Sequence, residues 1–180
     1  MSKVLIISSS LRNKSNSLIL ANKVLDGALS AGHDAKLISL KGKTINFCIG
    51  CLACQKTGKC VQKDDVAEMM EEVRNADTLV FVSPIYYYEM SGQLKTFLDR
   101  MNPLYGSDYN FKNVYLVTTA ADTDPLTPSR AIGGLEGWIS CFDGVRLVGN
   151  LFLEGNNDPS EVLTKQEQLD KAYEFGANLE

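Results

Sequence analysis

Five short apolar runs alternate along the chain with stretches in which apolar residues recur at helical spacing. The runs are rich in Val, Leu and Ile, which is typical of strands buried on both faces. They occupy residues 3–8, 35–40, 78–82, 113–118 and 145–152. The helical stretches cover 16–31, a segment capped by Asp64, a segment capped by Ser91, 129–142 and 159–179. This order predicts an α/β protein with a parallel sheet and right-handed crossovers.

Two doubly wound folds of this size have that order of elements, the Rossmann-like and the flavodoxin-like fold. In both, a ligand binds beyond the carboxyl ends of the strands. We therefore expect the site in the loops that follow the first, third and fourth strands. No linker divides the chain, so residues 1–180 are predicted to form one domain, with an irregular cysteine-rich loop at about 46–63.

Composition narrows the class of protein. Hydrophobic residues make up 44% of the 180 residues and the formal net charge is −4, which argues against disorder and against general attraction to nucleic acid or membrane surfaces. No stretch approaches the ~20 apolar residues that cross a bilayer, and the apolar run at 4–7 is too short for a signal peptide. We expect a cytoplasmic protein without a nucleic-acid or membrane partner.

The loop after the first strand is rich in hydroxyl and amide side chains. Residues 8–17 contain five serines, two asparagines, Arg12 and Lys14, and they lead into a helix. A helix N-terminus offers free N–H groups and partial positive charge, and arginine can fork onto phosphate oxygens. The loop therefore suits a phosphate monoester. The alternative is a solvated capping loop, because Ser and Asn favour helix caps in any case.

The loop after the third strand suits a flat ring. Pro84, Ile85 and three consecutive tyrosines from Tyr86 follow the third strand. Aromatic rings and backbone amides can cover a heteroaromatic ring and bind its edge. Alternatively, the tyrosines only pack beneath the loop.

Four of the five cysteines form a C-x2-C-x2-C-x5-C pattern at Cys48, Cys51, Cys54 and Cys60. Closely spaced thiolates can hold a [4Fe-4S] cluster, and Lys56, Lys59 and Lys63 would offset its negative charge. Zinc, free thiols and disulfides are the alternatives. Cys141 has no other cysteine near it in sequence and is predicted to be a small core residue on a helix. The single histidine, His33, has no surroundings suited to a hydrolase triad, and we assign no catalytic residue.

Two segments resemble the NADPH-dependent FMN reductase branch of the flavodoxin-like superfamily. Ser10 to Ser17 reads S-x-R-x-x-S-N-S, with Ser9, Leu11 and Ser17 in place of the usual Gly, Pro and Thr, and 83–100 resembles the flavin-contacting segment. The resemblance covers about residues 3–175 and implies a flavodoxin-like five-stranded parallel sheet in the order 2-1-3-4-5. It implies that the FMN phosphate is bound by Ser10, Arg12, Ser15, Asn16 and Ser17.

The same resemblance implies contacts to the flavin ring. Those on the isoalloxazine are Pro84, Ile85, Tyr86 and Tyr87, and those at its pyrimidine edge are Thr118, Thr119, Ala120 and Ala121. The two alanines stand where a glycine is common. Lys95, Asp99 and Arg100 also match the family, and we interpret them as ion pairs on a helix surface or at a subunit contact.

The cysteine pattern is similar to that of the iron–sulfur flavoproteins of anaerobes, in which it accompanies an FMN domain. This resemblance implies an FMN-dependent oxidoreductase that passes electrons between NAD(P)H or a ferredoxin-type donor and a quinone, a flavin or another small acceptor. It also implies a homodimer or homotetramer. For electron transfer, the thiolates are expected to lie at the surface near the flavin edge. The alternative is a non-enzymatic phospholigand-binding protein whose cysteine loop is held by zinc.

Overall fold

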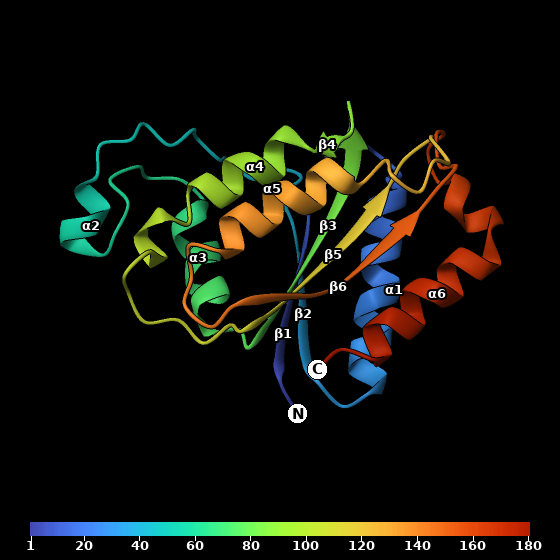
Figure 1. Ribbon diagram of the computed structural model, residues 1–180, viewed down its shortest axis with the longest axis horizontal. Helices are drawn as coiled ribbons and strands as arrows, with labels where there is room; N and C mark the ends of the chain where they lie inside the picture. Colours follow the sequence, from blue (N-terminus) through green and yellow to red (C-terminus); the bar gives the residue numbers. More distant parts are fainter.

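The computed structural model describes residues 1–180 and contains a central sheet of five parallel strands (Figure 1). Along the sheet the order is β2-β1-β3-β5-β6, which confirms the predicted 2-1-3-4-5 arrangement once a short extra strand is set aside. The parallel strands are β1 Lys3–Ser8, β2 Asp34–Ser39, β3 Thr78–Tyr86, β5 Asn113–Thr119 and β6 Arg146–Leu153. The extra strand, β4 Glu89–Met90, pairs antiparallel with the end of β3. Two residues are too few to show the alternation that indicates a strand in sequence.

Helices cover both faces of the sheet (Figure 1). On one face lie α1 Asn16–Ser30 and α6 Gln166–Ala177, packed against strand residues such as Val4, Ile6 and Val80. The other face carries α3 Val66–Asn75, α4 Gly92–Asp99 and α5 Ser129–Ile139. Successive side chains of a strand point to opposite faces, so continuous apolar runs supply both cores.

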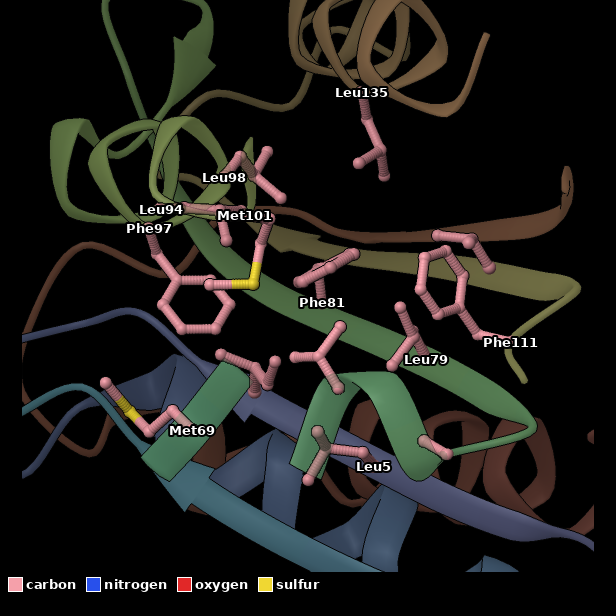
Figure 2. Close-up of a cluster of buried hydrophobic side chains, with 14 of the residues drawn as sticks. Leu5, Met69, Leu79, Phe81, Leu94, Phe97, Leu98, Met101, Phe111 and Leu135 are labelled. Carbon is pink, nitrogen blue, oxygen red and sulfur yellow. The ribbon is translucent and has the colours of Figure 1, made fainter. Parts of the chain in front are cut away.

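The core beneath α3, α4 and α5 is the larger of the two, with 23 buried residues. Figure 2 shows Leu5, Leu79 and Phe81 of the sheet facing Met69 of α3 and Leu94 of α4. The amphipathic spacing of these helices in sequence therefore corresponds to their buried faces.

Helices α1 and α6 cross at two glycines. A Cβ placed on Gly27 would overlap the carbonyl oxygen of Tyr173, and one placed on Gly176 would overlap the carbonyl oxygen of Val24. Only residues without a side chain allow the two backbones to come this close. The contact fixes α6 against the helix whose N-terminus lies at the site described below.

Several predicted boundaries differ from the structure. The 41–63 loop contains a short helix, α2 Ala53–Thr57, and a 3₁₀ turn, η1 Asn102–Leu104, follows α4. The helix expected over 159–179 is divided into η2 Glu161–Thr164 and α6. Its first part is held by the loop before α1, because the N–H of Ser160 donates to the carbonyl oxygen of Lys14 at 2.8 Å.

Two residue assignments are wrong. Cys141 is exposed rather than in the core, because α5 ends at Ile139 and Phe142 turns inward instead. Asp64 is not the N-cap of α3, since the helix begins at Val66 after Asp65 and the Asp64 carboxylate is held mainly by Arg100. Ser91 does cap α4, accepting from the N–H of Leu94. None of the helices has the length and apolar character needed to cross a bilayer.

Candidate functional site

A cleft of about 390 Å³ lies at the carboxyl ends of β1, β3 and β5. Eleven of the thirteen predicted cofactor-binding residues line it, from all three expected loops. They are Ser10, Arg12, Ser15, Asn16, Ser17, Pro84, Ile85, Tyr86, Thr119, Ala120 and Ala121. Parallel strands bring these loops together because all their carboxyl ends meet at one edge of the sheet.

The loop after β1 presents buried hydroxyls at the N-terminus of α1. Ser10, Ser15 and Ser17 are all buried, and Ser15 caps the helix by accepting from the N–H of Leu18 at 3.2 Å. No acidic residue stands in the first turn of α1. The first N–H groups of the helix and its positive end therefore face the cleft, as an anion site requires.

A serine network joins this loop to the loop after β3. The hydroxyls of Ser9 and Ser91 lie 2.8 Å apart, and the N–H of Ser91 donates to the hydroxyl of Ser83 at 3.0 Å. All three serines are fully buried. The network holds the two walls of the cleft in register, a role that spacing in sequence does not reveal.

The tyrosine loop is a tight turn rather than a packed cluster. Tyr87 and Tyr88 have φ of 51° and 66°, as the two central residues of a primed hairpin turn between β3 and β4 require. Non-glycine residues seldom adopt this conformation, and such strain gathers at functional sites. Tyr86 lines the cleft, whereas Tyr87 is 98% exposed and lies outside the lining.

The loop after β6 adds two residues that the sequence reasoning missed, Asn156 and Asn157. The N–H of Asn156 donates to the carbonyl oxygen of Ala120 at 2.7 Å, and Arg12 donates to the carbonyl oxygen of Asn157 at 2.6 Å. This loop could have been predicted to reach the cleft, because it also follows the carboxyl end of a parallel strand.

Glu161 holds the loop after β6 in shape. Its carboxylate accepts from the N–H groups of Asp158 and Asn157, and these bonds, helped by Lys165, lower the pKa of Glu161 to about 2. The carboxylate is therefore ionised at every pH above about 3, and this wall of the cleft keeps its hydrogen bonds across the physiological range.

Two residues that line the cleft each contain a buried side-chain oxygen that has no partner in the protein. The Thr119 hydroxyl and the Asn156 amide oxygen are unpaired, although these residues are only 5% and 7% exposed. Buried polar groups are nearly always hydrogen-bonded, so both oxygens are expected to bind a further partner. Thr118, one residue before Thr119, is buried but does not line the cleft.

The four clustered cysteines line a second, smaller pocket together with Arg100 and Asn102. The cleft and the cysteine pocket lie at opposite ends of α4. Tyr86, which lines the cleft, precedes the helix, and Arg100, which lines the cysteine pocket, follows it. Figure 1 shows α2 of the cysteine loop far from β4 along this helix. The thiols do lie at the surface, with Cys48 and Cys51 exposed, but they do not lie beside the cleft of the same chain.

All five cysteines are free thiols. No group of three or more His, Cys, Asp or Glu side chains is placed to hold a single metal ion, so the zinc alternative gains no support. Two of the four sulfurs accept hydrogen bonds, Cys54 from Asn102 at 3.1 Å and Cys60 from Arg100 at 3.4 Å. Four thiols around one pocket with N–H donors directed at sulfur are suited to an iron–sulfur cluster.

Arg100 is buried, which corrects the expectation of a surface ion pair. Arg100 and Asp64 form a salt bridge at 2.6 Å with side chains 1% and 0% exposed. Lys95 and Asp99 do form the expected exposed pair. Burial alone would raise the pKa of Asp64, but hydrogen bonds from Arg100 and from the N–H groups of Asn46 and Val66 bring it below its ordinary value. Arg100 is left with its pKa raised by Asp64 and Cys60 despite burial.

Comparison with known proteins decides the family. The sequence profile described as NADPH-dependent FMN reductase matches residues 2–126, which include the serine-rich loop, the cysteine loop and the tyrosine loop. The chain belongs to the NADPH-dependent FMN reductase family.

Relatives of this reductase include proteins named for an iron–sulfur group. The iron–sulfur flavoprotein MJ1083 of Methanocaldococcus jannaschii is 33% identical over 159 residues, which cover 88% of this chain and 78% of the relative. YwqN of Bacillus subtilis, named as an NAD(P)H-dependent FMN-containing oxidoreductase, is 28% identical over 178 residues, 94% of each chain. The matched region spans only 44%, 50% and 53% of three iron–sulfur flavoproteins of Archaeoglobus fulgidus.

Solved structures show the same fold as the reductase. An NAD(P)H:quinone oxidoreductase from Methanothermobacter marburgensis superposes with a TM-score of 0.76, at 20% identity, over 99% of this chain and 96% of that one. This superposition confirms the predicted fold. Membership of the family confirms the predicted class of NAD(P)H-dependent FMN oxidoreductase, with FMN as cofactor and NAD(P)H as cosubstrate.

Proposed function

We propose that this reductase binds FMN in the cleft and a [4Fe-4S] cluster on Cys48, Cys51, Cys54 and Cys60, and that it passes electrons between NAD(P)H or a ferredoxin-type donor and a quinone or free flavin. The observation that carries the proposal is the convergence of the three predicted loops on one cleft, two of whose lining residues, Thr119 and Asn156, contain a buried side-chain oxygen without a partner. Bound FMN supplies hydride and single-electron chemistry, while the protein binds and orients it.

The phosphate of FMN is proposed to lie at the N-terminus of α1. Ser10, Ser15, Asn16 and Ser17 surround this end, and Arg12 retains N–H groups beyond the one that binds Asn157. A terminal dianion suits a loop that ends on a helix, whereas the pyrophosphate of FAD would need a path onward for its adenosine. We therefore propose non-covalent FMN.

The isoalloxazine is proposed to lie between the β3 and β5 loops. Pro84, Ile85 and Tyr86 offer an apolar wall, and Thr119, Ala120 and Ala121 lie at the end of β5. The Thr119 hydroxyl is a donor and the side-chain amide oxygen of Asn156 is an acceptor, and neither has a partner in the protein. They therefore fit the mixed polar edge of a flavin.

Arg12→Ala is expected to weaken FMN binding by about 1.5–3 kcal/mol, the range for a hydrogen bond to a charged group. Titration of the apoprotein with FMN measures the affinity. Lys23→Ala is the matched control, because it removes a positive charge from the exposed side of α1. An affinity for FMN equal to that of the wild type would exclude Arg12 from phosphate binding.

Thr119→Val is expected to weaken FMN binding by about 0.5–1.5 kcal/mol and to leave the apoprotein as stable as before or more stable. The reason is that the hydroxyl is unpaired without a ligand, so its removal costs the apoprotein no hydrogen bond. Thr118→Val, outside the cleft lining, is the control. A loss of apoprotein stability with unchanged FMN affinity would contradict this role.

The position of the cysteine pocket favours a homo-oligomer. Exposed apolar side chains surround the thiols, with Phe47 77% and Ile49 70% exposed. A neighbouring subunit that covered them could also bring a flavin to the thiols, which α4 separates from the cleft of their own chain. Light scattering at micromolar concentration is expected to give a dimer or tetramer, and a monomer would contradict the proposal.

We further propose that residues 1–180 act as one FMN-binding domain with the cysteine loop at about 46–63 as its second redox site. A cytoplasmic location is proposed because four clustered free thiols need a reducing compartment to stay available for iron.

The proposed activity is tested by adding NADPH, NADH or reduced ferredoxin to anaerobically purified protein and following flavin absorbance. Bleaching by at least one donor and recovery on adding a quinone are expected. Bound flavin that none of the three donors reduces would contradict an oxidoreductase role and favour a binding protein.

A further inference from the structure

Arg100 links the cysteine loop to the body of the protein. It lies at the C-terminal end of α4, and its guanidinium donates to the carbonyl oxygen of Asn46 at 2.8 Å and to both carboxylate oxygens of Asp64. A further N–H of the same group donates to the sulfur of Cys60 at 3.4 Å. Its Nε has no partner although the side chain is 1% exposed. Arg100 is thus more constrained than an ion pair alone requires.

Asn102 makes the matching contact on a second cysteine. It lies in η1, two residues after Arg100, and its side-chain N–H donates to the sulfur of Cys54 at 3.1 Å. Cys54 is buried and Cys60 is partly buried, whereas Cys48 and Cys51 are exposed and reachable by water. The two less accessible sulfurs are the ones that receive N–H donors from the protein.

We propose that Arg100 and Asn102 are positioning residues that raise the reduction potential of the cluster by donating hydrogen bonds to Cys60 and Cys54. The inference rests on the proposed function, because it requires the cluster. One electron from a low-potential donor makes the cluster one unit more negative, and part of that charge falls on the ligand sulfurs. N–H donors therefore stabilise the reduced state more than the oxidised state.

Asp64 determines how Arg100 acts. The carboxylate neutralises the guanidinium at 2.6 Å, so the pair contributes little net charge to the pocket. Asp64 also accepts from the N–H of Asn46, and this second bond anchors the start of the cysteine loop to the same carboxylate. Arg100 is thereby held in the orientation that directs one N–H at Cys60. We infer that its influence on the cluster comes from this directed N–H rather than from its charge.

The test is a redox titration of the cluster in the intact protein, reduced stepwise with dithionite and followed by electron paramagnetic resonance. Arg100→Lys keeps a cation beside Asp64 but lacks the fork that also reaches Cys60. Asn102→Leu removes the donor to Cys54 at similar size. In each variant the equilibrium constant for one-electron reduction is expected to fall about tenfold, which corresponds to a potential lower by about 59 mV.

Lys95→Gln is the matched control, because it removes a positive charge from the exposed side of the same helix. It is expected to leave the equilibrium constant for one-electron reduction within about twofold of the wild-type value, since solvent screens an exposed charge. Iron, sulfide and FMN are measured on every preparation. If either Arg100→Lys or Asn102→Leu fails to fold, the potential measured in the other variant tests the inference.

A wild-type iron content with an unchanged potential in the variants that fold would overturn this inference and leave the proposed function intact. Absence of iron from anaerobically purified wild type would overturn both. A purely structural role for Arg100 and Asn102 would lower stability without moving the potential, which is also a result against the inference.

Discussion

Gly27→Ala is expected to lower the free energy of unfolding by at least about 3 kcal/mol, at the upper end of the range for overpacking. The new methyl group would overlap the backbone of Tyr173 and lie 2.8 Å from the nitrogen of Ala177. Backbone atoms cannot rotate away as a flexible side chain can, so α1 and α6 would have to separate. Gly176→Ala should have a similar effect from the opposite helix, because it meets the backbone of Val24.

Denaturant unfolding monitored by circular dichroism measures the loss. Gly137→Ala on α5 is the control, because nothing lies within 4 Å of the added methyl group. It should stabilise the protein by up to about 1 kcal/mol through helix propensity. Equal midpoints for Gly27→Ala and wild type would show that the two helices are not packed as described. Since α1 presents its N-terminus to the cleft, FMN affinity should fall together with stability in Gly27→Ala.

Asp64→Ala is expected to lower the free energy of unfolding by about 3–5 kcal/mol, because it leaves the buried Arg100 charge unpaired. It also removes the acceptor for the N–H groups of Asn46 and Val66. Breaking the exposed pair of the same helix with Lys95→Ala should cost no more than about 1 kcal/mol. Chemical denaturation compares the two. A cost for Asp64→Ala as small as that for Lys95→Ala would contradict the buried bridge.

Acid should lower the stability of the folded protein, because it protonates the carboxylate of Asp64. The pKa of Asp64 in the folded state lies below its ordinary value of 3.8, so the unfolded chain takes up the proton first as the pH falls. The stability that Asp64 contributes is complete at neutral pH and is lost progressively from about pH 4 downward. Asp64→Asn should remove this part of the acid dependence, which unfolding curves at a series of pH values will show.

The layered fold could be predicted because its signals are local. Each strand is one apolar run, and helices such as Val66–Asn75 show their buried face in the spacing of Val66, Met69, Met70 and Val73. The βα repeat indicates parallel strands, whose carboxyl ends meet at one edge of the sheet, so three of the loops that line the cleft could be predicted as well. The strand order itself was implied by the family resemblance. Residue types in those loops then indicated a phosphate and a flat ring.

What could not be predicted depends on partners far apart in sequence. Asp64 and Arg100 are 36 residues apart, and nothing near either one distinguishes a buried pair from a helix cap and a surface charge. Asn156 reaches the cleft because the loop after β6 is tied to Ala120 and Arg12. The cysteines are separated from the cleft because their loop contacts Arg100 and Asn102 at the C-terminal end of α4, and these contacts could not be predicted from sequence.

The central claim is that one chain carries both FMN and a cluster on the four cysteines. The decisive measurement is FMN, iron and acid-labile sulfide per chain after anaerobic purification, for the wild type and for alanine variants of Cys48, Cys51, Cys54 and Cys60. Cys141→Ala is the control, because Cys141 is exposed and lies outside the cysteine pocket. We predict about one FMN with about four iron and four sulfide in the wild type and in the control. Each of the four variants should lose iron and sulfide while keeping FMN. Full FMN with no iron or sulfide in the wild type would contradict the cluster and leave an FMN reductase with free thiols.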